Sequence, residues 1–261
     1  MNTTALITWA SSWIWKELAI IHAEKGGNLV LVARREEKLL ALKHELEKKH
    51  WVSVEVIAKD LTEVNAAQEV YQQIKKKWIQ IDYLVNNAGF GGQGVFYERV
   101  RDQDQKMIQL NILTLTELTR RFLPDFVERN SGKILQVSST ASFMPGPLQA
   151  VYFATKAYVQ SFSNAIAYEL HDTNITVTNL MPGATETEFA KTWWLEKTSL
   201  FAQTVTARSV AEEGYDGMIQ GKIDVISGLS FYQKLMFVFM PFIPKQLLMK
   251  EVYKMQVVKK I

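Results

Sequence analysis

The strongest constraint on the fold is a regular alternation of short apolar runs with longer amphipathic segments. Runs rich in Val, Ile and Leu are typical of buried strands, and they lie at 4–8, 28–33, 52–58, 81–86, 132–138, 174–180 and 222–227. Segments with apolar residues at helical spacing and charges on the opposite face lie between them, at 35–50, 62–77, 103–130 and 150–171. This alternation predicts an α/β fold, a single doubly wound parallel sheet with helices on both faces.

The alternating pattern stops near residue 228. We expect residues 1–228 to form a Rossmann-like domain. Residues 229–261 are apolar and basic, and they are predicted to form a helical extension of the same domain. A chain of 261 residues that is 48% hydrophobic is large enough to bury one core of this size.

Composition narrows the classes of function. The chain has no cysteine, which excludes disulfides, thiolate zinc sites and a cysteine nucleophile, and its four histidines have no partner at metal-ligand spacing. A net charge of +3 is too small to favour nucleic acid as a partner. The N-terminal apolar run lacks a basic leader, and the run at 235–243 is too short to span a bilayer. We therefore expect a soluble, cytoplasmic protein without a metal site.

Candidate chemistry lies on one predicted helix, where Tyr152 and Lys156 are four residues apart and share a face. A lysine ammonium beside a phenol favours the phenolate and lowers the phenol pKa, which makes Tyr152 a candidate proton donor to a carbonyl oxygen. The spacing alone carries little information, because Tyr71 and Lys75 repeat it. Ser139 distinguishes the two pairs, since it ends a predicted strand upstream of Tyr152 and can place a hydroxyl against a substrate carbonyl.

Other motifs extend this constellation along the chain. In chain order the set comprises "NNAG" (86–89), Asn111, Ser139, Tyr152, Lys156 and "PG" with Thr185 (182–185). In this order and spacing the sequence resembles the short-chain dehydrogenase/reductase family, over residues 4–190. The set is specific as a whole, whereas each member alone is common.

The resemblance implies a role for each of four catalytic residues. Tyr152 would be the general acid in carbonyl reduction, and Lys156 would hold the nicotinamide ribose and lower the Tyr152 pKa. Ser139 would orient the carbonyl and stabilise charge that develops on its oxygen. Asn111 would hold a water in a proton relay.

The resemblance also implies a dinucleotide site. Asp60 would contact the adenine, Asn87–Gly89 would pack along the adenosine, and Thr185 would meet the nicotinamide amide. The full expected set is Thr8, Ser11, Ser12, Ile14, Arg34, Arg35, Asp60, Leu61, Asn87, Ala88, Gly89, Tyr152, Lys156, Pro182, Gly183 and Thr185. Arg34 and Arg35 follow a strand where an acidic residue would favour NAD, so they favour the 2′-phosphate of NADP(H). The alternative is that both arginines are solvated charges at a helix start.

The first loop departs from the family pattern. The family has Thr-Gly-x-x-x-Gly-x-Gly, whereas this chain has "TWASSWIW" (8–15), with Trp at every glycine position. Those glycines serve the turn, the approach of the pyrophosphate and helix–strand packing, all of which an indole obstructs. All seven tryptophans are candidates for glycine positions: Trp9, Trp13, Trp15, Trp51, Trp78, Trp193 and Trp194. Our hypothesis is that they are UGA codons, which some bacterial lineages read as glycine; engineering and natural degeneration are the alternatives.

Two functions follow from these features. The first is an NADP(H)-dependent oxidoreductase that interconverts a carbonyl and a secondary alcohol. Its substrate is expected to be hydrophobic, acyl or steroid-like, because the segments 141–151 and 189–202 that should wall the pocket are mostly apolar. The alternative is a non-catalytic binding protein whose cofactor loop is blocked by Trp9, Trp13 and Trp15.

The segment 229–260 combines Phe, Met and Leu with six lysines. One interpretation is that it packs on the domain or on a second subunit, and the family resemblance implies a homodimer or homotetramer. The other interpretation is an interfacial helix pair, broken by proline near 241–244, that makes a peripheral membrane contact.

Overall fold

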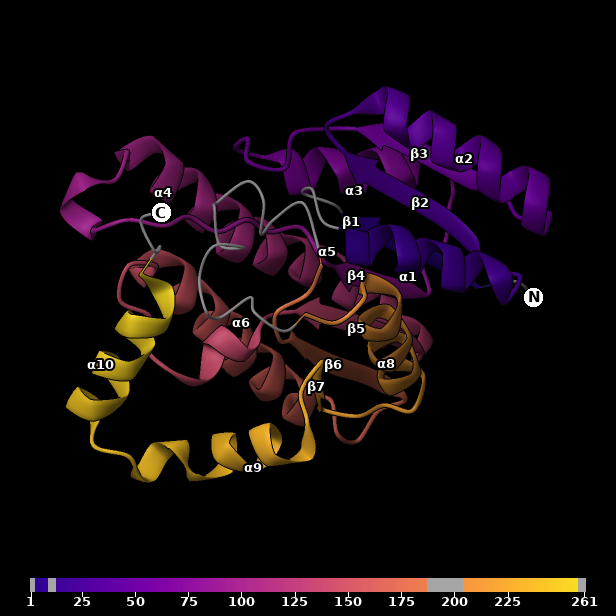
Figure 1. The fold of residues 1–261 in the computed structure, drawn as a ribbon. Helices are drawn as coiled ribbons and strands as arrows, with labels where there is room; N and C mark the ends of the chain where they lie inside the picture. The colour runs from indigo at the N-terminus through magenta and orange to yellow at the C-terminus, as the bar shows by residue number, and fades with distance from the viewer. Residues whose placement is uncertain (1–2, 9–12, 187–203, 258–261) are drawn as a thin grey trace.

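The computed structural model describes residues 3–8, 13–186 and 204–257, which form one seven-stranded parallel sheet (Figure 1). The strand order is β3-β2-β1-β4-β5-β6-β7. The strands are β1 (Thr4–Thr8), β2 (Asn28–Ala33), β3 (Val54–Ala58), β4 (Tyr83–Asn86), β5 (Gly132–Val137), β6 (Ile175–Pro182) and β7 (Asp224–Ser227). The doubly wound parallel sheet expected from the apolar runs is therefore confirmed.

Helices cover both faces of the sheet. The long helices are α1 (Trp13–Glu24), α2 (Glu36–His50), α3 (Ala66–Lys76), α4 (Arg101–Ile108), α5 (Leu115–Arg129), α6 (Ala150–Glu169), α8 (Ala207–Ile219), α9 (Phe231–Phe239) and α10 (Lys245–Gln256). One core cluster holds apolar residues of α1, α2 and α8, and a second holds those of α3, α5 and α6. The strands are apolar on both faces because each face is buried against one of these layers.

The predicted helix 103–130 is not continuous. It consists of α4, the π-helical turn η2 (Gln109–Thr114) and α5. Shorter 3₁₀ segments are η1 (Phe96–Glu98), η3 (Thr140–Phe143) and η6 (Met240–Phe242). A π turn is invisible to a 3.6-residue period, so the sequence could not reveal it.

The winding direction of the sheet reverses at β1, which pairs with β2 on one side and with β4 on the other. Thr8, the last residue of β1, is in register with Val32 of β2 and Asn86 of β4. The carboxyl ends of parallel strands on either side of such a reversal border a crevice that binds ligands in this class of fold. The loops after β1 and β4 are therefore the first place to look for a site.

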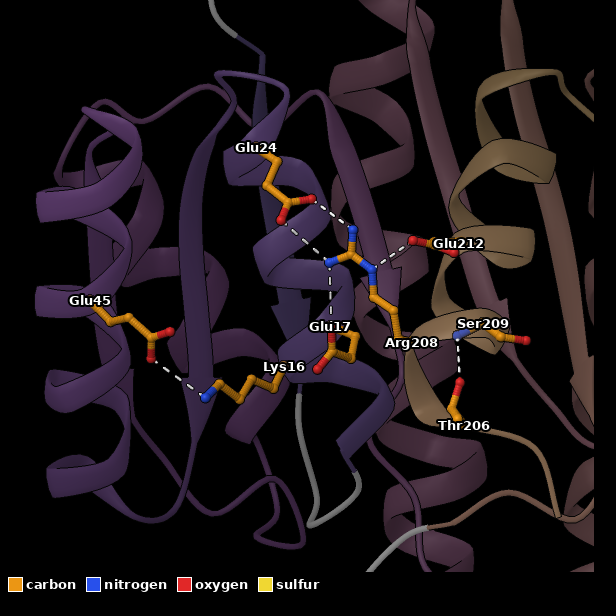
Figure 2. A network of polar contacts seen from close by, with 8 residues as sticks. All are labelled: Lys16, Glu17, Glu24, Glu45, Thr206, Arg208, Ser209 and Glu212. Carbon is orange, nitrogen blue, oxygen red and sulfur yellow. Dashed lines mark hydrogen bonds and ion pairs between the residues drawn. The ribbon is translucent and has the colours of Figure 1, made fainter.

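A polar network fixes α1, the helix that follows the first loop, against α8 (Figure 2). Arg208 on α8 forms ion pairs with Glu24 (2.8 Å) and Glu17 (3.5 Å) on α1 and with Glu212 (2.7 Å) on its own helix. Beneath this network His22 Nδ1 lies 2.9 Å from the hydroxyl of Tyr215. These contacts hold the middle and the C-terminal end of α1 against α8.

The last described segment, residues 229–257, forms an arm of two helices at the edge of the molecule, drawn yellow in Figure 1. We call it the C-terminal arm. The hydroxyl of Ser230 caps α9 by accepting from the backbone N–H of Gln233, whose side chain accepts from the Ser230 N–H in return. None of the helices in the described part of the chain is long and apolar enough to cross a membrane.

Candidate active site

Three of the expected catalytic side chains meet at the carboxyl end of β5. Tyr152 and Lys156 lie on the first turns of α6, with Lys156 Nζ 5.8 Å from the centre of the Tyr152 ring. Ser139 follows β5 and makes a hydrogen bond with the Tyr152 side chain. The second pair, Tyr71 and Lys75, instead approaches Asp125 of α5, at 3.4 and 3.3 Å. Ser139 thus contacts Tyr152, whereas the described partner of the second pair is Asp125.

Burial sets the charge state of this group. Burial raises the pKa of Tyr152 to about 12, and the hydrogen bond with Ser139 acts in the opposite direction. Burial also lowers the pKa of Lys156 to about 8. The expected lowering of the Tyr152 pKa by Lys156 is wrong for this structure, because desolvation disfavours the charged form of both groups and Nζ is engaged elsewhere. It donates a hydrogen bond to the carbonyl of Val137, at 2.8 Å.

Asn111 lies in the π turn and is 1% exposed. Its Nδ2 donates to the carbonyl of Phe90 and to the hydroxyl of Thr155, both at 3.0 Å, and its Oδ1 accepts from the Phe90 N–H at 3.1 Å. Thr155 in turn donates to the carbonyl of Tyr152 at 2.7 Å. Asn111 therefore clamps the loop after β4 to α6, and its side chain could hold the expected water only through the second acceptor position of Oδ1.

The loop "NNAG" is held to the end of β1 by Thr8. The Thr8 hydroxyl accepts from the backbone N–H groups of Asn87 and Ala88, both at 3.2 Å, and donates to the carbonyl of Val85. The amide nitrogen of the Asn87 side chain is buried and has no hydrogen-bond partner among the described residues. Such a donor is costly unless a ligand meets it, so it is consistent with a bound group in the crevice.

The absence of a side chain at Gly89 lets the backbone approach Asn111 and Lys156 closely. A Cβ added there would lie 3.2 Å from Asn111 Oδ1 and 3.3 Å from Lys156 Nζ, tighter than most side-chain contacts. This position brings the backbone of the loop after β4 directly against two of the expected catalytic side chains. Thr8 at the end of β1, the loop after β4 and the side chains of Asn111 and Lys156 therefore lie close together.

The ends of β2 and β3 carry the residues expected at the adenine end of the cofactor. The Arg34 guanidinium is 3.8 Å from the Asp60 carboxylate, and the Arg34 side chain is 61% exposed. Asp60 Oδ1 also accepts from the backbone and the hydroxyl of Thr62. Arg35 is exposed at the start of α2, whereas Leu61 is buried and its carbonyl accepts from Thr114 of the π turn.

The end of β6 lies beside Ser139. The Ser139 hydroxyl is 3.5 Å from the carbonyl of Pro182, and the Gly183 N–H donates to the carbonyl of Ser227. Thr185 is buried, and its hydroxyl donates to the carbonyl of Gly183 at 3.0 Å. These residues therefore lie at the same end of the sheet as Ser139 and Tyr152.

The first loop is only partly described. Ser11, Ser12 and Trp9 lie outside the described residues, as do Trp193 and Trp194. Trp13 begins α1, and the side chains of Ile14 and Trp15 are buried in the core cluster beneath that helix.

Trp51 and Trp78 occupy a different environment. Their backbones are left-handed, with φ of 58° and 55°, and their side chains are 91% and 94% exposed. Glycine adopts this conformation freely, whereas for a bulky residue it is an outlier. Because both indoles are exposed, their burial does not offset the backbone strain.

The helix α10 packs on the domain, as one interpretation of segment 229–260 expected, but its position beside Tyr152 was not predicted. Val252 of α10 packs with Ala141 and Phe153, and Leu248 and Tyr152 lie against the same cluster. Gln256 anchors the end of the helix, because its side-chain oxygen accepts from Gln149 and its carbonyl accepts from Gln93. No local pattern could have signalled these contacts, because they join residues that are far apart in the sequence.

Comparisons with known proteins agree with this geometry. Residues 3–198 match the family model described as short chain dehydrogenase. The chain is 34% identical over 190 residues to the uncharacterized oxidoreductase YvaG of Bacillus subtilis, covering 72% of this chain and 70% of that protein. It is 33% identical over 193 residues to the very-long-chain 3-oxoacyl-CoA reductase of Mus musculus, covering 72% of this chain but only 61% of the reductase.

A solved structure extends the likeness to the whole fold. The short-chain dehydrogenase from Sphingobium yanoikuyae in complex with NADPH superposes with a TM-score of 0.83 at 29% identity, covering 98% of both chains. The family match, the sheet topology and the group around Tyr152 point in one direction. The chain belongs to the short-chain dehydrogenase family.

Proposed function

We propose that the protein is an NADP(H)-dependent oxidoreductase that interconverts a carbonyl and a secondary alcohol on a hydrophobic substrate. The observation that carries this proposal is the meeting of Tyr152, Ser139 and Lys156 beside Gly89 at the carboxyl end of the sheet. With a pKa of about 12, Tyr152 keeps its proton at neutral pH and can donate it to a carbonyl oxygen. Ser139 can donate a hydrogen bond to the same oxygen and hold it in place.

The carboxyl end of the sheet has candidate residues for both halves of a dinucleotide. The unmatched Asn87 amide and the backbone around Gly89 would hold the adenosine side, and Lys156 and Thr185 would hold the nicotinamide side. When bound, the cofactor supplies or accepts the hydride. Arg34 and Arg35, exposed at the end of β2, would bind a 2′-phosphate.

The cofactor assignment is tested by replacing the two arginines. The Arg34→Ser/Arg35→Ser variant should lose at least ~10-fold in affinity for NADPH, since charge-assisted hydrogen bonds to phosphate contribute about 1.5–3 kcal/mol each. Its affinity for NADH should change much less. Fluorescence titration with both cofactors measures the two affinities, and equal losses would contradict the 2′-phosphate assignment.

A hydrophobic substrate is supported by the wall next to Tyr152. Leu248, Val252 and Phe153 form an apolar cluster there, to which Met144 also belongs. Relatives named as very-long-chain 3-oxoacyl-CoA reductases suggest an acyl chain as the apolar part. Turnover of a series of 3-oxoacyl thioesters of increasing chain length, followed by loss of NADPH absorbance, tests this class.

We also propose that the seven tryptophan positions are glycines in the functional protein. The left-handed, exposed Trp51 and Trp78 support this, because both sites have the geometry of glycine. The coding DNA decides the matter: a codon other than UGA at positions 51 and 78 would contradict it. Peptide mass spectrometry of the protein from its natural host would show which amino acid is inserted.

The alternative is a non-catalytic protein with a blocked loop. It is distinguished from the oxidoreductase by NADPH binding after glycine is placed in the first loop. A Trp9→Gly/Trp13→Gly/Trp15→Gly variant should bind NADPH more tightly than the chain as written if the indoles obstruct the pyrophosphate. Because Trp15 is buried, a Trp9→Gly/Trp13→Gly variant that keeps the core intact is the companion measurement. A folded variant with no NADPH binding in either form would favour the non-catalytic alternative.

A further inference from the structure

The C-terminal arm exposes a large apolar surface. Phe242 is 82% exposed and Tyr232 is 78% exposed, and Met236, Phe239, Leu247 and Tyr253 are also exposed. These side chains come from α9, η6 and α10, so each helical segment of the arm exposes apolar groups. A concentration of exposed apolar groups marks contacts with another surface in folded proteins.

The charge of the arm is almost all positive. Its described residues carry Lys234, Lys245, Lys250 and Lys254 against a single acidic residue, Glu251. Lys254 pairs with Glu251 at 2.7 Å, whereas no carboxylate among the described residues lies within ion-pair distance of the other three lysines. The arm therefore offers exposed apolar groups and unneutralised ammonium groups side by side.

The arm is anchored rather than loosely attached. Val252 and Gln256 are buried against the domain, and the rings of Phe143 and Phe237 lie with centres 4.9 Å apart. Figure 1 shows the two helices along one edge of the molecule, away from the sheet. The contacts of Val252, Gln256 and Phe237 therefore fix the arm to the domain while its exposed apolar side chains face the solvent.

We propose that the C-terminal arm docks on the surface of an anionic lipid bilayer. Its apolar side chains would enter the boundary between headgroups and acyl chains, and its lysines would contact lipid phosphates and carboxylates. Two short helices interrupted at η6 can lie in that plane, but neither can span it. A second copy of the chain fits less well, because a two-fold contact would place the same lysines on both sides with only Glu251 to neutralise them.

Docking has a consequence for the substrate that rests on the proposed function. The inner side of α10 packs beside Tyr152, through Leu248 and Val252. A docked arm would therefore hold the candidate active site next to the lipid. The matching substrate class is an apolar carbonyl or alcohol compound dissolved in the membrane.

Vesicle flotation tests the docking without cofactor or turnover. We expect the full chain to float with phosphatidylcholine/phosphatidylserine vesicles at low ionic strength, less at high ionic strength, and much less with phosphatidylcholine alone. A Lys234→Gln/Lys245→Gln/Lys250→Gln variant should lose the preference for phosphatidylserine.

The apolar part of the contact is tested with matched serine variants. Met236→Ser/Phe239→Ser/Phe242→Ser should weaken vesicle binding at least ~10-fold, because these exposed side chains would be buried in lipid. Phe96→Ser/Tyr97→Ser, which alters exposed aromatic residues outside the arm, should bind as the parent does. Failure of the parent to float with anionic vesicles at low salt overturns the proposal. So does a lipid-free oligomer that the arm variant dissociates, since a second copy would then cover this face.

Discussion

Trp51 and Trp78 follow the ends of α2 and α3 in a conformation that is unfavourable for a side chain with a Cβ. Replacing either with glycine removes about 1–2 kcal/mol of strain but returns about 0.5–1 kcal/mol of chain entropy to the unfolded state. We therefore expect each glycine variant to gain roughly 0.5–1 kcal/mol in the free energy of unfolding. Thermal unfolding should show a rise of about 2–4 °C for each kcal/mol gained.

The alanine variants of the same two residues are the control. Alanine removes the indole but keeps the Cβ, so it should give little or none of this gain. Equal stabilisation by alanine and glycine would show that the indole itself, and not the backbone, causes the penalty.

Tyr152 is expected to be the proton donor, and its hydroxyl is the only group that Tyr152→Phe removes. In a chain with glycine at positions 9, 13 and 15, this variant should lose at least roughly 10²-fold in turnover, the usual scale for positioned acid–base catalysis. NADPH affinity should remain nearly unchanged. Tyr71→Phe is the matched control, since Tyr71 also has a lysine at the same spacing, but its hydroxyl donates to Asp125 of α5. Comparable turnover of the two variants would remove Tyr152 from the mechanism.

At the scale of elements, the π turn and α6 are joined by Thr155. Thr155→Val keeps the volume but removes the hydroxyl that accepts from Asn111 and donates to the Tyr152 carbonyl. Leaving one Asn111 hydrogen without its partner should cost about 1–3 kcal/mol in the free energy of unfolding. Urea denaturation measures this cost, and Ser163→Ala, which removes only a hydrogen bond within α6, should cost less.

Turnover per folded molecule shows whether Thr155 supports the site itself or only the stability of the fold. If Thr155 only supports the fold, turnover per folded molecule should be the same in Thr155→Val and in Ser163→Ala. We expect turnover to fall only in Thr155→Val, because its partners hold the loop against Lys156.

The elements differ in how far the sequence could predict them. The strands and the parallel order follow from apolar runs and helical periods, because burial on both faces leaves a local mark in the sequence. The meeting of Ser139 and Tyr152 followed from the motif spacing. The π turn around Asn111 and the contact of α10 with Phe153 could not be foreseen, since one breaks the helical period and the other depends on distant packing.

At the scale of the whole molecule, we expect His22 to make the free energy of unfolding depend on pH. Its ring bonds Tyr215 of α8 and the carbonyl of Thr3, and burial lowers its pKa from the usual 6.5. Below pH 6.5 the unfolded chain binds a proton that folded His22 resists, so this contribution to stability is present above pH 6.5 and is lost as the pH falls through the folded pKa. The slope from this group can reach about 1.4 kcal/mol per pH unit.

Urea denaturation of the parent and of His22→Gln between pH 7.5 and about 5 measures this effect. We expect the variant to be less stable at neutral pH but to lose less stability on acidification. Identical slopes for the parent and His22→Gln would show that His22 does not carry the dependence.

The attachment of α10 through Gln256 also bears on the order in which the molecule is made. The partners of Gln256 are Gln93 and Gln149, which precede it by 163 and 107 residues. Synthesis proceeds from the N-terminus, so the sheet and Tyr152 leave the ribosome before this helix does. The apolar wall beside Tyr152 can therefore close only after α10 has been made, and a nascent chain without α10 has the candidate catalytic side chains but lacks this wall.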